Sequence, residues 1–176
     1  MKEHGMIFSG DSVRAILEGR KTMTRRVLKP QPERLGWNEG WFHKGGYWSH
    51  PKRKYHPGDL IWVREGWCLP GEPHYRNPGT VLYKADNGEA ESEITKAKAW
   101  RSPLFMPRWA SRITLKVKST RFERVQEITE EDAEREGVPS YWNFAETWNS
   151  INGTTGPKSW EANPWVVVIE FAREEG

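Results

Sequence analysis

The sequence predicts a single α+β domain, a small β-barrel with short flanking helices. Its 176 residues suit one domain that buries its own core. About five stretches with strand character lie far apart along the chain, and three short stretches have helical character. We find neither an internal repeat nor a domain boundary, so residues 1–176 are treated as one domain.

Helical periodicity is clearest near the start of the chain. Val13, Ile16 and Leu17 form one apolar stripe, which predicts a helix over 9–18 that ends at Gly19. Two further short helices are expected at 129–136 and 141–148.

Apolar alternation or continuous apolar runs predict strands at 22–28, 60–65, 80–84, 112–122 and 164–171. The last of these is nearly continuous in apolar residues and should be a central strand. The stretch 33–56 is rich in Gly, Trp and His without a clean period, and 85–99 is expected to be a polar loop or a frayed helix.

Composition excludes several classes of protein. The formal net charge is only +3, so basicity is local, and it lies mostly in the amino-terminal half. Cys68 is the single cysteine, which excludes an internal disulfide and favours a reducing compartment. No apolar run approaches the length of a membrane span and no signal peptide is recognisable, so we expect a cytoplasmic protein with no membrane partner. The spacing of the five histidines does not predict a metal site, and no cofactor is expected.

The segment 19–26 carries a lysine, two threonines and three arginines directly after the predicted helix. Neighbouring cations or burial lower the pKa of a lysine, so Lys21 is a candidate base, and Thr24 is a candidate nucleophile or water ligand. On a regular strand these two side chains point to opposite faces, so they converge only if the chain is still turning at Lys21. The alternative is a solvated basic strand.

Glu136 lies in the last turn of the predicted helix 129–136, where the helix dipole disfavours a negative charge. It is about 60° from Ala133, the one apolar residue of that helix, so it leans towards whatever the helix packs on. The alternative is an ordinary surface glutamate.

Arginines and tryptophans gather where two predicted strands begin or end. This composition suits stacking of a base and pairing with a phosphate or carboxylate, and the alternative is an Arg–Glu ion pair with a rim of packed indoles. The residues concerned are Arg64, Glu65, Trp67, Trp109 and Arg112.

Together these motifs resemble the ASCH-domain proteins of the PUA-like superfamily, in the version common in phages and prophages. The ASCH signature, Gly-x-Lys-x-x-(Glu or Thr)-x-Arg after a short helix, is met by Gly19, Lys21, Thr24 and Arg26. Further matches are found at 7–10, 57–59, 62–65, 106–112, 163–165 and 169–171. The resemblance spans nearly the whole chain, with 33–56 and 85–99 as variable inserts.

The resemblance implies a PUA-like barrel with a cleft for a nucleoside or single-stranded RNA. One branch of the family hydrolyses N(4)-acetylcytidine with a lysine, a threonine and a glutamate, which correspond to Lys21, Thr24 and Glu136. We therefore expect an amidohydrolase that removes an acyl group from the exocyclic amine of a cytidine-type nucleoside. The expected substrate-binding residues are Arg26, Arg64, Glu65, Trp67, Trp109 and Arg112. The alternatives are an RNA-binding module without catalysis and a ribonuclease.

Overall fold

The computed structural model describes residues 1–32, 34–35, 41–43, 46–48, 54–69, 81–86 and 100–174. The chain divides into two compact units. Unit 1 comprises Met1–Lys21, Gly58–Lys116 and Ala172–Gly176, and unit 2 comprises Thr22–Pro57 and Val117–Phe171. Both units combine strands with a few short helices, so the chain has a mixed α+β fold.

Unit 1 is built around a pair of parallel strands. Strand β1 (Glu3–Ile7) pairs in parallel with β6 (Leu60–Arg64), and β6 pairs in antiparallel with the first residues of β9 (Thr114–Arg124). Gly5 lies opposite Trp62, and a Cβ at this position would be 2.6 Å from Cζ2 of the Trp62 ring. The close approach of the indole therefore explains why a glycine stands in the middle of β1.

Helix α1 (Gly10–Leu17) follows β1 in unit 1. Its amino end is capped by Ser9, whose hydroxyl accepts a hydrogen bond of 3.3 Å from the backbone N–H of Ser12. At its other end Gly19 adopts a φ of 76°, a left-handed conformation that glycine adopts without a steric penalty. The cap and the glycine together fix where the basic segment begins.

The remainder of unit 1 contains the short strands β7 (Trp67–Cys68) and β8 (Leu82–Tyr83), which pair in antiparallel, and the two 3₁₀ turns η1 (Pro103–Phe105) and η2 (Arg108–Ala110). A small apolar cluster holds these parts together. Its buried members are Trp67, Met106 and Ala110, with Leu69, Val81 and Tyr83 packed against them.

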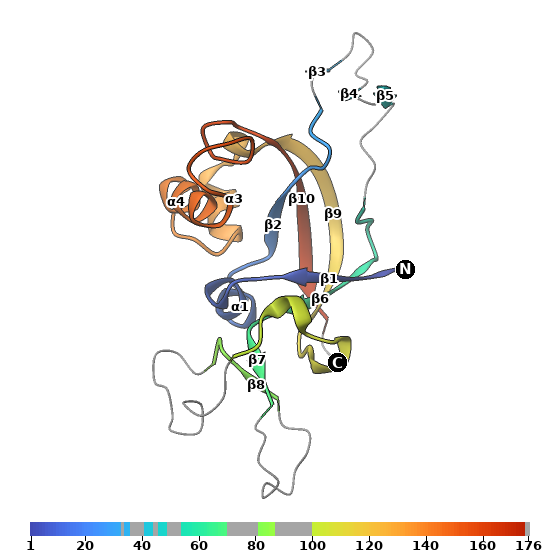
Figure 1. The fold of residues 1–176 in the computed structure, drawn as a ribbon, viewed down its shortest axis with the longest axis vertical. Helices are drawn as coiled ribbons and strands as arrows, with labels where there is room; N and C mark the ends of the chain where they lie inside the picture. Colours follow the sequence, from blue (N-terminus) through green and yellow to red (C-terminus); the bar gives the residue numbers. More distant parts are fainter. Residues whose placement is uncertain are drawn as a thin grey trace, which may run out of the picture. The chain divides into compact units, whose positions relative to one another are not determined.

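In unit 2 the strand order is β9, β10 (Trp165–Arg173) and β2 (Met23–Val27), so β10 is the interior strand and β2 an edge. Strands β10 and β2 are antiparallel. Helices α3 (Glu130–Arg135) and α4 (Tyr141–Asn152) lie on one side of this sheet (Figure 1). The 3₁₀ turn η3 (Val125–Glu127) follows β9, and the short strands β3 (Arg34–Leu35), β4 (Trp41–His43) and β5 (Gly46–Trp48) form a separate small sheet.

The core of unit 2 lies between the sheet and the two helices. Alternate residues of β2 and β10 point into it, and large aromatic side chains of α4 fill it. The fully or nearly fully buried members are Met23, Val125, Ile128, Ala133, Phe144, Ala145, Trp148, Trp160, Val166 and Val168. This core fixes which side chains of β2 face the helices.

The predicted helices correspond to α1, α3 and α4, and the five predicted strands correspond to β2, β6, β8, β9 and β10. The short strands of 33–56, strand β1 and strand β7 were not predicted. In the insert 85–99, residues 87–99 lie outside the described part. The paired strands that the structure describes form open sheets, so the α+β class is confirmed and a closed barrel is not.

Candidate functional site

Strand β2 carries the centre of the predicted site. Met23 and Arg25 share the face that packs on the helices, because Met23 belongs to the apolar core and the guanidinium of Arg25 lies 5.8 Å from the centre of the Phe144 ring. By the alternation of a strand, Thr24 and Arg26 share the opposite face. Thr24 is 4% exposed and lies opposite Ile169 of β10.

Lys21 precedes the strand rather than forming part of it. Its backbone N–H donates a hydrogen bond of 3.0 Å to the carbonyl of Ala15, and β2 begins only at Met23. The chain is therefore still leaving helix α1 at Lys21. Lys21 is the last residue of unit 1 and is only 5% exposed, so the alternative of a solvated basic strand is wrong.

Arg25 makes the densest set of polar contacts in unit 2, although it was not predicted as a site residue. Its side chain is completely buried. Nε and Nη2 donate to Oε1 of Glu123 at 2.9 and 2.6 Å, Nη2 also donates to Asp132, and Nη1 donates to Oε1 of Glu136 at 3.2 Å. Such charge-assisted bonds offset the cost of burying the cation.

The contacts of Arg25 continue into a larger arginine–carboxylate cluster, defined as Arg25, Arg121, Arg135, Glu123, Asp132, Glu136 and Glu170. Arg121 donates to Glu123, Asp132 and Glu170 at 2.9, 2.6 and 2.9 Å. Burial opposes ionisation of Glu170, but hydrogen bonds from Arg135 and Ser119 and the charges of both arginines outweigh it, so the pKa of Glu170 is lowered.

Glu136 is buried rather than a surface glutamate, with 7% of its surface exposed. It follows the last turn of α3, where its negative charge opposes the helix dipole, and the bond from Arg25 compensates for this. The carbonyl of the preceding Arg135 accepts a hydrogen bond of 2.8 Å from the backbone N–H of Thr22, so the end of α3 lies at the start of the edge strand β2.

Arg26 lies on the same face of β2 as Thr24 and interacts electrostatically with Glu136. Burial lowers the pKa of Arg26, while the charges of Glu136 and Tyr55 act in the opposite direction. In unit 2, Glu136 thus binds Arg25 directly and interacts with Arg26 through its charge. By alternation the hydroxyl of Thr24 is on the face away from Arg25, and Lys21 belongs to the other unit.

Within unit 1, Glu65 and Arg112 form a two-point ion pair. Nε and Nη2 of Arg112 donate to Oε1 and Oε2 of Glu65 at 3.0 and 3.1 Å, and Arg112 also binds Asp86 at 2.6 and 2.8 Å. Burial raises the pKa of Glu65, and the hydrogen bond and charge of Arg112 act against this. Glu65 and Arg112 therefore form the Arg–Glu ion pair that the sequence predicts as the alternative to a ligand-binding role.

The predicted tryptophans and Arg64 are divided between core and surface. Trp67 is 2% exposed and Trp109 is 65% exposed, although their rings meet edge to face at 6.1 Å. Arg64 donates to the carbonyl of Leu104, and its guanidinium lies 5.3 Å from the centre of the Trp62 ring. Trp109 is thus the predicted aromatic residue that is open to a ligand.

Among the described residues no group of three or more His, Cys, Asp and Glu side chains is placed to hold a metal ion. None of the helices in the described ranges combines the length and the apolar sequence that a membrane crossing requires.

No family model and no curated protein matches the chain. One solved structure, titled "Crystal structure of hypothetical protein PH0355", is similar over 99% of this chain and 100% of its own, with 16% sequence identity and a TM-score of 0.48.

Proposed function

We propose that this protein is an ASCH-domain amidohydrolase of the PUA-like superfamily that removes an acyl group from the exocyclic amine of a cytidine-type nucleoside. The observation that carries the proposal is the burial of Lys21, Thr24 and Glu136, which are 5%, 4% and 7% exposed. A lysine and a glutamate are rarely buried to this extent without a structural or chemical reason.

In the proposed reaction the hydroxyl of Thr24, or a water that it holds, attacks the acyl carbonyl carbon while the amine of Lys21 accepts the proton. The proposal requires the amine of Lys21 to be neutral at this step, because only the neutral amine can accept the proton. The bond from the carbonyl carbon to the exocyclic nitrogen then breaks, and the proton passes to that nitrogen. If Thr24 itself attacks, a water hydrolyses the acyl-threonine, and the products are cytidine and a carboxylic acid on either route.

Glu136 supplies the negative charge of the proposed site. Because Nη1 of Arg25 holds Oε1 of Glu136 at 3.2 Å, the carboxylate has a defined orientation. Its role in the proposal is to orient Lys21 or to pass the proton to the leaving amine. Arg26, which interacts with Glu136, is proposed to bind the base or the ribose.

The test is release of cytidine from N(4)-acetylcytidine by the purified protein, followed by liquid chromatography. We expect Lys21→Met and Thr24→Ala to lower the rate by about 100-fold or more, the usual scale for a lost acid–base or nucleophilic group. Arg20→Met is the matched control, because Arg20 is exposed and pairs with the exposed Glu18. Wild-type rates in Lys21→Met or Thr24→Ala, with folding verified by circular dichroism, would contradict the proposal.

A second candidate function is binding of single-stranded RNA. It is favoured by the surface of unit 1, where Phe105 and Trp109 are 72% and 65% exposed in a segment that also contains Arg108. Bases stack on exposed aromatic rings, and binding weakens as salt rises. If this function is present, a labelled single-stranded RNA should show a lower fluorescence anisotropy when mixed with Trp109→Ala than when mixed with the wild type. Cleavage of the same RNA into fragments would indicate the ribonuclease alternative.

A further inference from the structure

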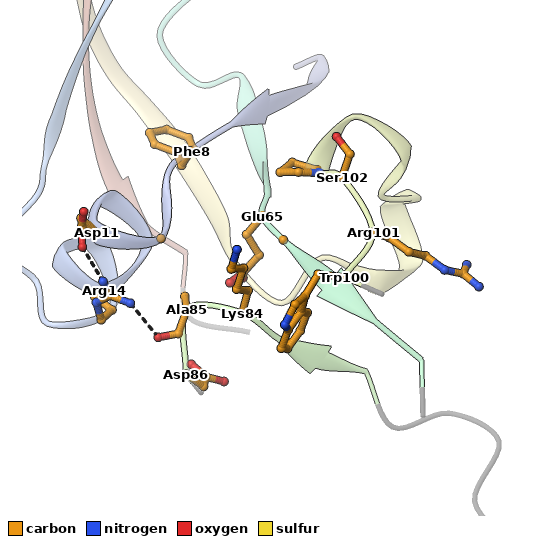
Figure 2. Close-up of a pocket in the computed structure, with 13 residues that line it drawn as sticks. Phe8, Asp11, Arg14, Glu65, Lys84, Ala85, Asp86, Trp100, Arg101 and Ser102 are labelled. Carbon is orange, nitrogen blue, oxygen red and sulfur yellow. Dashed lines mark hydrogen bonds and ion pairs between the residues drawn. The ribbon is translucent and has the colours of Figure 1, made fainter. Parts of the chain in front are cut away.

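Unit 1 contains a pocket of about 820 Å³ that none of the proposed catalytic residues lines. Its walls come from four separate stretches of the chain, 8–14, 65–66, 84–86 and 100–103 (Figure 2). This volume lies within the range of pockets that bind small molecules and cofactors. The pocket is therefore large enough for a ligand such as a nucleotide.

The cationic side chains that line the pocket differ in the contacts that they make. Arg14 pairs with Asp11 and donates a hydrogen bond of 3.1 Å to the carbonyl of Ala85, and the guanidinium of Arg101 lies 5.0 Å from the centre of the Trp67 ring. Lys84 is exposed and makes no ion pair within the part of the chain that the structure describes. Lys84 is thus a cation of the pocket that an anionic ligand can bind without breaking an ion pair of the described residues.

The stem of Lys84 is held in place by Gly66. The backbone N–H of Lys84 donates to the carbonyl of Gly66 at 2.8 Å, and a Cβ on Gly66 would lie 3.1 Å from Cβ of Lys84. A larger residue at 66 would push the lysine stem outwards. The stem of Lys84 therefore packs against Gly66, and Lys84 lines the pocket without an ion pair to any described residue.

Each carboxylate of the pocket already forms an ion pair with an arginine. Glu65 and Asp86 both bind Arg112, which does not line the pocket, and Asp11 binds Arg14. Their remaining lone pairs are acceptors for N–H donors, so the pocket offers both an ammonium and carboxylate acceptors. A ligand that carries an anion at one end and an amine at the other matches this arrangement.

Two aromatic side chains complete the pocket. Phe8 is buried, whereas Trp100 is half-buried, and in the view of Figure 2 Lys84 lies between them. A half-buried indole and a cation that line one pocket suit a ligand with a planar ring that stacks and a charged group that reaches the ammonium.

We infer that this pocket binds a nucleoside 5′-monophosphate, with the base on Trp100, its exocyclic amine towards the carboxylates, and the phosphate on Lys84. This site contains none of the proposed catalytic residues, although Glu65, an expected substrate-binding residue, is one of its lining residues. It uses residues at the start of the insert 85–99 and directly after its end.

The test is titration of the full chain with adenosine 5′-monophosphate, followed by NMR shifts of the backbone amides. Its adenine is not a base of the proposed hydrolase substrate, so the two sites are probed separately. We expect Lys84→Ala to weaken binding about tenfold or more, the loss of one charged contact to phosphate. Adenosine, which lacks the phosphate, should bind the wild type and Lys84→Ala equally, and Trp100→Ala should weaken both ligands.

Lys118→Ala is the control for a change of charge, because Lys118 is an exposed lysine of β9. It should bind the nucleotide as the wild type does, and so should Thr24→Ala. The inference is overturned if the wild type does not bind at millimolar nucleotide, if Lys84→Ala binds as tightly as Lys118→Ala, or if Thr24→Ala loses binding. Because Lys84 is exposed, its variant keeps the test valid even if Trp100→Ala does not fold.

Discussion

Replacing Arg25 with methionine is the change that most directly tests the arginine–carboxylate cluster of unit 2. Methionine keeps a long apolar stem but removes the cation that binds Glu123, Asp132 and Glu136. Arg121 also pairs with Glu123 and Asp132, so these two carboxylates keep a cation in the variant. The expected loss of unfolding free energy is therefore that of one broken buried pair, about 3–5 kcal/mol, and not a multiple of it.

Urea denaturation at neutral pH measures this loss as a change in unfolding free energy. Arg20→Met is the matched control, since the pair of Arg20 with Glu18 is exposed and such pairs contribute about 0–1 kcal/mol. If Arg25→Met costs no more than Arg20→Met, the buried cluster does not stabilise unit 2 and the reasoning is refuted.

Two further changes test particular contacts. Glu170→Gln should destabilise the protein at neutral pH, because a lowered pKa in the folded state contributes stability that is present above the unfolded value of about 4.3. The difference from the wild type should disappear as the pH falls through the folded pKa, and a difference that persists at the lowest pH would contradict this. Gly5→Ala should cost about 1–3 kcal/mol, because its Cβ would meet the Trp62 ring at 2.6 Å. Gly10→Ala is the control, since the nearest atom to its Cβ is 3.7 Å away, and equal thermal stability of the two variants would refute the steric argument.

Elements with a strong local period could be predicted from the sequence. Helix α1 follows from its stripe of apolar residues and its glycine end, and β10 from its apolar run. Strand β1 could not, because Gly5 interrupts its pattern and the reason for that glycine is the indole of Trp62 on another strand. The two-residue strand β7 likewise depends on its long-range pairing with β8.

For the candidate site, sequence reasoning names residues but not the contacts that they make. The angle between Glu136 and Ala133 on their helix correctly predicted that Glu136 leans inwards. Its bond with Arg25 joins residues 111 positions apart, and no local pattern encodes such a pair. The one available signal was that Arg25 alternates with Met23, an apolar residue, on a predicted strand. The pocket around Lys84 could not be predicted from local patterns either, because four separate stretches of the chain form it.

The most direct measurement for the central proposal is the rate of cytidine release from N(4)-acetylcytidine by the wild type and by Thr24→Val in the same buffer. Valine has nearly the shape of threonine and lacks only the hydroxyl, so the buried position remains filled. We predict measurable release by the wild type and a fall of about 100-fold or more in the variant. Equal rates in the two proteins, or no release by the folded wild type, would contradict the account.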